Sequence, residues 1–408
     1  MIAVLKKDNW IINAIIEDDK VRELSVFTPD EYMRIGSIYV GKVKNIVKNI
    51  DSCFVEFSNK EQGYYNIVKE EPIFVNGKSS GDKLKAEDEI LVQIKREVKA
   101  NKPVTLTSKI ELSTHRIVLI MGKTGINVSK KIKDKDEKER LKNILSNEAG
   151  EGYSLIARTD CVGESEETIV SDIKKLKEEM KGILKKAKSL KAFSALKPPV
   201  KSYLSVLSSV RKSYLDKIIT NDKEIFQEIN AFQNEAGSDE VANNIPVELW
   251  DEENGKNPDI IYRITTTLDK SLQSNVWLKH GGFLIIEHTQ ALTVIDVNSG
   301  GDIKKKKKAE EFFFDVNKEA AIEICNQIRL RNISGIIIID FIDMADKKKK
   351  DELLHVLREE FLKDSIKSVV VDITKLGLVE ITRKRVLPPL YEQVNKCKRV
   401  NENNGSEE

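Results

Sequence analysis

The chain has 408 residues, of which 40% are hydrophobic and 33% are charged. This length and composition predict a folded protein of several domains and exclude a largely disordered chain. Acidic and basic residues nearly cancel, at a net charge of +2, so only local clusters of charge can indicate a nucleic-acid partner.

The sequence gives no sign of a membrane span or of export. No apolar run approaches the roughly 20 residues that a spanning helix needs. Met1 to Asn9 lacks the apolar segment and cleavage site of a signal peptide, so we expect a cytoplasmic protein. The absence of a CxxC pair predicts buried, reduced thiols. The four cysteines are Cys53, Cys161, Cys325 and Cys397.

The first 35 residues read as a small strand meander. Apolar residues run from Trp10 to Ile16, residues 17–19 are an acidic turn, and residues 23–26 form the next strand. A strand pair of this size is not stable alone, so we expect it to complete a sheet built later in the chain.

Residues 36–110 contain short strands separated by glycine-rich turns, which predicts a small barrel of the OB kind. The expected strands are 38–43, 53–57, 63–67, 89–94 and 104–107.

Aromatic and basic residues are interleaved in this barrel. Phe54 and Tyr64 occupy strand positions, with Lys42, Lys44 and Lys102 around them. Aromatics stack bases and lysines neutralise phosphates on single-strand-binding OB surfaces, so Phe54, Tyr64 and Lys102 are candidate RNA-binding residues. The alternative is that one or both aromatics belong to the core.

Residues 111–199 mix strands and helices. Strands are expected at 117–120 and 154–157, and apolar residues at spacings of three and four predict a helix from Ser165 to before Pro198. Arg158 and Thr159 directly follow the second strand, and a guanidinium beside a hydroxyl suits a terminal phosphate. A second helical stretch is expected over 201–234. It carries Leu204, Leu207, Leu215, Ile218 and Ile219.

Strands and helices alternate over 260–390, which predicts an α/β layer on a central sheet. A polar tail from Asn401 is expected to be disordered. The expected strands are 282–287, 291–297, 336–341 and 368–373, and the expected helices are about 309–331 and 349–362.

Two of these strands end in an aspartate. Leu292–Ile295 leads to Asp296, and Ile336–Ile339 leads to Asp340, and both strands look buried on two faces. Ligands of open α/β sheets bind beyond the carboxyl ends of strands, and Mg²⁺ is commonly held by one or two carboxylates. Such an ion activates water and stabilises charge on a phosphodiester. Asn298 lies two residues after Asp296, on the same face, and is a candidate to orient a ligand or water.

Simpler interpretations remain open for these residues. Each aspartate can instead cap the following loop, and we interpret Asp343 as a structural partner and Asp346 as a helix N-cap. Two lysine runs, Lys304–Lys308 and Lys347–Lys350, stand near helix starts, where cations oppose the helix dipole. A passing RNA backbone would favour them, although a solvated charged face explains them too.

Three longer segments resemble the ribonuclease E/G family. The first is Ala291–Gly300, the second runs from Glu319 through Arg331 to Met344, and the third is Leu376–Arg383. The resemblance covers about residues 1–390 and is strongest after 280. It implies a multidomain α/β protein in which an OB-fold RNA-binding barrel (36–110) is inserted into a split RNase H-like domain (1–35 and 200–275). A 5′-end sensor segment (111–199), a DNase I-like catalytic domain (276–390) and the polar tail (391–408) follow.

The resemblance also implies a function. Asp296 and Asp340 would hold Mg²⁺ with Asn298 assisting, and Arg158 and Thr159, helped by Lys130 or Lys131, would bind a 5′-monophosphate. Phe54, Tyr64 and Lys102 would lie on the RNA path. Family members are endoribonucleases that cut AU-rich single-stranded RNA in messenger decay and ribosomal RNA processing.

The chain departs from the family in three respects. The usual CxxC pair that joins two chains through zinc is incomplete at Cys397, which does not favour a zinc site, so any homo-oligomer would lack that link. We also expect this chain to lack the small C-terminal domain of long members, and Gly301 stands where the family commonly has a basic residue. Two other readings stay open, a non-cleaving RNA-binding protein and a deoxyribonuclease, the latter by fold analogy alone.

Overall fold

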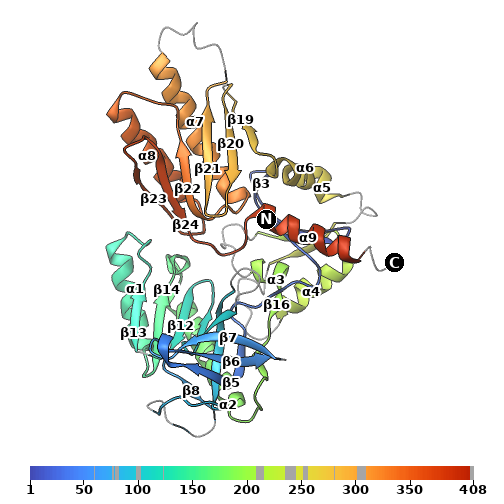
Figure 1. Ribbon diagram of the computed structural model, residues 1–408, viewed down its shortest axis with the longest axis vertical. Helices are drawn as coiled ribbons and strands as arrows, with labels where there is room; N and C mark the ends of the chain where they lie inside the picture. The colour runs from blue at the N-terminus through green and yellow to red at the C-terminus, as the bar shows by residue number, and fades with distance from the viewer. Residues whose placement is uncertain are drawn as a thin grey trace. The chain divides into compact units, whose positions relative to one another are not determined.

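The computed structural model describes residues 1–58, 60–75, 78, 82–97, 103–122, 124–207, 216–234, 245–250, 256–279, 281–300 and 309–404. The chain forms two compact units (Figure 1). One contains residues 1–29, 213–230 and 245–408, and the other contains residues 30–212 and 231–244. Among the described helices, none is long and apolar enough to cross a membrane.

The first unit begins with a five-stranded sheet in the order β18-β17-β1-β2-β3. Its strands are β1 (Ile2–Lys7), β2 (Trp10–Glu17), β3 (Lys20–Phe27), β17 (Ile218–Thr220) and β18 (Val247–Leu249). β1 pairs in parallel with β17, so the N-terminal meander does complete a sheet with strands from much later in the chain. Helices α5 (Pro258–Tyr262) and α6 (Ile264–Ser271) follow β18.

The expected second helical stretch over 201–234 is wrong. It divides into α3 (Ser202–Leu207), β17 and α4 (Lys223–Asn234). Ile218, Ile219 and Thr220 are buried between β1 and β18, and these β-branched residues suit the centre of a sheet. Leu215 lies outside the described residues.

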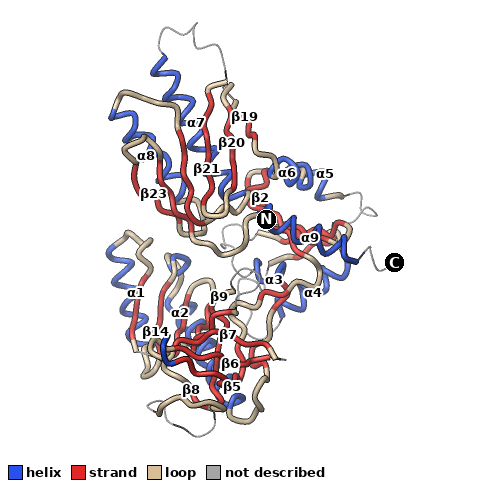
Figure 2. Tube along the Cα trace, in the orientation of Figure 1, coloured by secondary structure: helices blue, strands red, loops and turns tan. Residues whose placement is uncertain are grey.

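The same unit carries a six-stranded sheet in the order β19-β20-β21-β22-β24-β23. Its strands are β19 (Asn275–Trp277), β20 (Phe283–His288), β21 (Leu292–Asn298), β22 (Gly335–Asp340), β23 (Ser368–Ile373) and β24 (Val379–Arg383). Helices α7 (Ala309–Leu330) and α8 (Lys347–Phe361) lie beside this sheet (Figure 2). Apolar side chains of both helices share one core with the sheet. The predicted α/β layer is therefore confirmed.

The C-terminal segment differs from the expected disordered tail. α9 spans Leu390–Asn404, and its buried residues Leu390, Val394 and Cys397 pack into the core of the five-stranded sheet. Their spacing of three and four gives the helix an apolar side that the polar composition obscures. All four cysteines are free and buried, as predicted.

The second unit contains a closed five-stranded barrel, which confirms the predicted small OB-like barrel. Its strands are β5 (Ile38–Val47), β6 (Ser52–Ser58), β7 (Glu61–Asn66), β9 (Glu89–Arg96) and β10 (Val104–Thr107). They pair in the order β5-β6-β7-β10-β9, and β9 pairs back to β5. β8 (Ile73–Phe74) and β15 (Ala195–Lys197) extend this sheet, and β4 (Tyr32–Met33) pairs with β16 (Val200–Lys201).

A four-stranded sheet in the order β11-β12-β14-β13 shares a hydrophobic core with the barrel. Its strands are β11 (Glu111–Ser113), β12 (Ile117–Met121), β13 (Gly125–Val128) and β14 (Tyr153–Ala157), and it is flanked by α1 (Lys135–Glu148) and α2 (Glu166–Ala187). Ser165 caps α2 by accepting a hydrogen bond from the Thr168 amide, at the start predicted from the sequence.

Candidate active site

The two aspartates predicted as metal ligands lie side by side. β21 and β22 are parallel neighbours, and Asp296 is the register partner of Asp340. Side chains at paired positions of adjacent strands project from the same face of a sheet. One strand pairing therefore brings the two carboxylates together, although 44 positions separate them in the chain.

The expectation that β21 and β22 are buried on both faces is wrong, because one face of these strands is open. Thr293, Ile295 and Val297 are buried with Ile337 and Ile339 toward the helices. Asp296 and Asn298 lie on the opposite face and are half-buried, while Asp340 is exposed. The carboxylates thus stand on the open face of the sheet, where a large ligand has access.

Asn298 is tied to the first carboxylate. Its amide Nδ2 donates a hydrogen bond to Asp296 Oδ2 over 2.7 Å. Residues i and i+2 of a strand share a face, so this contact follows from the strand itself. Asn298 therefore fixes the orientation of Asp296.

The second carboxylate is held in a strongly acidic environment. Although Asp340 is exposed, the surrounding protein removes part of its hydration, which raises the pKa of its carboxyl above the usual value. The negative charges of Asp296 and Asp343 raise this pKa further. Like charges this close disfavour the ionised form unless a cation joins them. The pair fits a hard divalent cation, because both donors are carboxylate oxygens.

The loop that follows Asp340 is anchored by one buried side chain. Asn317 of α7 is fully buried, donates from Nδ2 to the Ile342 carbonyl over 2.7 Å, and accepts from the Ile342 amide at 3.0 Å. Asp346 begins α8 as its N-cap, as predicted, by accepting from the Lys348 amide. The lysines Lys347–Lys350 form the first turn of α8, and Lys304–Lys308 lie outside the described residues.

The two predicted barrel aromatics are neighbours. Phe54 and Tyr64 are register partners on β6 and β7, and both are half-buried, so neither belongs to the barrel core. Tyr64 in turn pairs with Thr105, and Thr105 pairs with Arg96, which is exposed. Arg96 was not among the candidate residues of this surface, because the strand expected from the sequence ended at residue 94, two residues before it.

The lysines near these aromatics have other partners. Lys42 Nζ lies 2.5 Å from a carboxylate oxygen of Glu87, and Lys44 contacts Glu56 at 3.3 Å. Both would have to exchange these partners to bind phosphate. Lys102 lies outside the described residues.

The residues predicted to bind a 5′-phosphate follow two strands that end at the same end of the four-stranded sheet. β13 and β14 are parallel and end together, and the Ser129 amide donates to the Ala157 carbonyl. The turn with Lys130 and Lys131 thus begins beside Arg158 and Thr159. Arg158 is exposed, and its Nη1 donates to the Thr114 carbonyl over 3.1 Å, which steadies the guanidinium.

A model of the ribonuclease E/G family matches residues 111–386. The chain belongs to the ribonuclease E/G family. It is 31% identical over 385 residues to ribonuclease E of Nostoc sp., with 93% of this chain and 55% of the relative covered. Ribonuclease E of Synechocystis sp. is 31% identical over 93% of this chain and 56% of its own length. Ribonuclease G of Haemophilus influenzae is 29% identical over 91% of this chain and 77% of its own length.

This member of the family spans about half the length of the two ribonuclease E relatives. The match covers the six-stranded sheet with both aspartates and the four-stranded sheet with Arg158. Among the described residues, no group of three or more His, Cys, Asp or Glu side chains forms a metal site. The candidate metal centre therefore rests on two carboxylates, with the Asn298 amide beside them.

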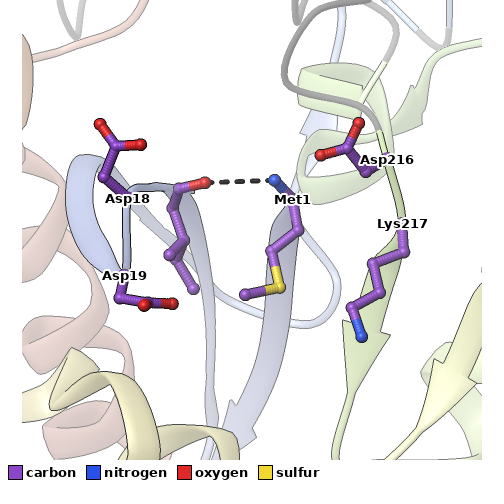
Figure 3. A pocket seen from close by; sticks show the side chains of 6 residues that line it. Met1, Asp18, Asp19, Asp216 and Lys217 are labelled. Carbon is purple, nitrogen blue, oxygen red and sulfur yellow. Dashed lines mark hydrogen bonds between the residues drawn. The ribbon is translucent and has the colours of Figure 1, made fainter.

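A separate pocket of about 300 Å³ lies in the first unit. It does not include the carboxylate pair. Figure 3 shows that the amino group of Met1 donates a hydrogen bond to the Ile16 carbonyl, beside Asp18, Asp19 and Asp216.

Proposed function

We propose that the chain is a metal-dependent endoribonuclease that hydrolyses phosphodiester bonds in single-stranded RNA. The observation that carries this proposal is the register pairing of Asp296 with Asp340 on the open face of the sheet. The names of the relatives, ribonuclease E and ribonuclease G, support the same reaction class.

In this proposal Asp296 and Asp340 hold Mg²⁺. A bound Mg²⁺ would supply Lewis-acid stabilisation of the phosphoryl group and an activated water. The chain's own part is to orient the ligands: Asn298 holds Asp296 through its 2.7 Å hydrogen bond, and Asn317 holds the backbone that follows Asp340. The two carboxylates repel each other, so a bound cation would relieve this repulsion and favour the ionised form of both.

We further propose how the RNA is held. Phe54 and Tyr64 would stack bases on the barrel, with Lys102 neutralising phosphate. Arg158, Thr159, Lys130 and Lys131 would bind a 5′-monophosphate, which would favour substrates with that end. By similarity to the family, AU-rich segments are the substrates, and messenger decay and ribosomal RNA processing are the processes.

The domain assignment is part of the proposal. We take 1–35 and 200–275 as the split RNase H-like domain, 36–110 as the RNA-binding barrel, 111–199 as the sensor and 276–390 as the DNase I-like catalytic domain. The strand pairing of β1 with β17 and the closed barrel support the first two assignments.

The test compares the parent with Asp296→Asn, Asp340→Asn and the control Asp351→Asn, whose carboxylate is exposed on α8. Each protein is incubated with 5′-monophosphorylated RNA, 5′-hydroxyl RNA and DNA of one sequence, with Mg²⁺ or EDTA. We expect Mg²⁺-dependent RNA cleavage by the parent and the control, and none by the two site variants, which still bind RNA.

Three outcomes would contradict parts of the proposal. Binding without cleavage by the parent would indicate a non-cleaving RNA-binding protein. Cleavage of the DNA at the same rate would indicate a nuclease without RNA specificity. Equal cleavage of both RNA ends, unchanged by Arg158→Gln, would remove the 5′-end sensor and leave the nuclease in place.

A further inference from the structure

The open face of the six-stranded sheet carries more than the carboxylates. Going across the strands, Trp277 of β19 pairs with Phe283 of β20, and Phe283 pairs with Asn298 of β21. Paired residues share a face, so all three lie on the face that carries Asp296 and Asp340. Trp277 is two strands from Asn298, roughly 10 Å at the usual spacing of strands.

Trp277 is 74% exposed, an unusual state for the largest apolar side chain. Its indole lies against the Phe283 ring, with centroids 5.3 Å apart and planes at 50°. A single exposed aromatic needs no explanation by itself. Here two aromatic rings adjoin on the strand pair next to Asn298, so their position relative to the carboxylates is the informative observation.

The backbone fixes this position. The β19–β20 turn packs against the end of β21, where a Cβ on Gly282 would lie 2.7 Å from the Asn298 carbonyl oxygen. Leu278 is buried next to Trp277, and the Lys279 amide donates to Glu319 of α7 over 2.6 Å. The aromatic pair is therefore held in a constant place relative to Asn298.

We propose that Trp277 and Phe283 form a stacking platform for one base of the RNA, at a nucleotide near the cleaved bond. This inference rests on the proposed ribonuclease activity. A neutral base is attracted to an aromatic ring without repulsion from the carboxylates, while its phosphate would be drawn to the cation that the two carboxylates would hold. Stacking tolerates any base, so the platform would position the strand rather than select a sequence.

The test uses a short 5′-monophosphorylated RNA with one cleavage site, in which each nucleotide around that site is made abasic in turn. We expect the parent to lose about tenfold in kcat/KM at one abasic position. Trp277→Ala should lose a similar factor on intact RNA and become insensitive to base removal at that position. Trp277→Phe should keep most of the sensitivity, and the control Ile260→Ala, which removes another exposed apolar side chain, should behave as the parent.

The outcomes separate the two proposals. If the parent does not cleave RNA, the proposed function fails. If the parent cleaves, and removal of the base at the sensitive position lowers kcat/KM of Trp277→Ala as much as it lowers kcat/KM of the parent, the platform is wrong and the nuclease stands. If Trp277→Ala loses kcat/KM on every RNA while keeping the parent's dependence on each base, the platform is also wrong, because that result indicates general damage to the sheet.

A binding measurement gives an independent readout. The chain has three tryptophans, Trp10, Trp250 and Trp277, of which Trp277 is exposed and Trp250 is buried. In the Asp296→Asn background, we expect single-stranded RNA to quench tryptophan emission, and Trp277→Phe to remove most of the quenching while RNA still binds. Quenching that persists in Trp277→Phe would contradict the proposal.

Discussion

Gly300 lies against Gly281, so close that a Cβ on Gly300 would overlap the Gly281 carbonyl oxygen. Gly300 also has a φ of +60°, in the left-handed region. The turn after β21 therefore fits against the β19–β20 turn only because Gly300 has no Cβ. Gly281 has its own requirement, a φ of +96°, since a Cβ there would meet nothing within 4 Å. This contact sets where Asn298 and the rings of Trp277 and Phe283 lie relative to each other.

We predict that Gly300→Ala lowers cleavage at least tenfold and destabilises the chain by about 1–3 kcal/mol, since it adds backbone strain and a steric overlap. Urea unfolding and steady-state cleavage measure the two effects. Gly182→Ala in α2 is the control, because nothing lies within 4 Å of its added Cβ, and alanine in a helix should stabilise by about 0.5–1 kcal/mol. A Gly300→Ala protein with parental cleavage would show that the turn is not critical.

The second prediction concerns the repulsion between the carboxylates. Replacing Asp340 with Asn removes one of the charges that face Asp296, so the melting temperature in EDTA should rise above that of the parent. Mg²⁺ should then raise the melting temperature of the parent and not that of the variant. Differential scanning calorimetry with EDTA and with Mg²⁺ tests both parts. Equal Mg²⁺ stabilisation of the two proteins would exclude Asp340 as a ligand.

The third prediction concerns Asn317. Asn317→Ala leaves the amide and carbonyl of Ile342 without their side-chain partner, at a cost of about 2–4 kcal/mol. We also expect a higher Mg²⁺ requirement for cleavage, because Asp340 lies two residues before the released backbone. Asn230→Ala, which removes a single hydrogen bond to the Phe226 carbonyl, should change neither quantity appreciably. Loss of stability with an unchanged Mg²⁺ requirement would restrict Asn317 to a structural role.

The fourth prediction concerns the barrel. Phe54→Ala and Tyr64→Ala should each weaken binding of single-stranded RNA about tenfold, since a stacked base contributes about 1–3 kcal/mol. Fluorescence anisotropy with labelled RNA measures the binding. Tyr32→Ala, an exposed aromatic on β4, is the matched control, and equal binding by all three variants would contradict an RNA surface at Phe54 and Tyr64.

The sequence was sufficient to predict the two strands that carry Asp296 and Asp340, because apolar β-branched runs followed by a charge are a local signal. Their parallel pairing comes from the structure, as does the extension of β21 to Asn298. The sequence did not indicate which face of β22 is open. Four consecutive isoleucines, Ile336–Ile339, show no alternation of polar and apolar residues, although their burial alternates: Ile336 is 50% exposed and Ile337 is buried. Exposure depends on which face the helices cover, and that is a tertiary property.

Other features depended on pairing partners far away in the chain. Ile218–Thr220 is too short to be recognised as a strand, and only β1 and β18 on either side make it one. The role of Trp277 was missed for a related reason. Its row on the sheet is defined by the pairing of Phe283 with Asn298, which the sequence of β19 alone does not contain.

The last prediction concerns His288, at the end of β20. Its ring stacks on Tyr391 of α9 with centroids 4.4 Å apart, and Nδ1 lies 3.0 Å from Thr293 Oγ1. Burial lowers the pKa of His288, and Arg331 lowers it further, against an opposing effect of Glu392.

A histidine whose pKa is lower in the folded state stabilises the fold above its unfolded pKa of about 6.5, and this contribution is lost as the pH falls below that value. We therefore expect the free energy of unfolding of the parent to fall more steeply between pH 8 and pH 5 than that of His288→Gln, which cannot be protonated. His355→Gln, at an exposed position of α8, should follow the parent. Identical pH profiles for the parent and His288→Gln would show that His288 takes up its proton equally well in the folded and unfolded chain.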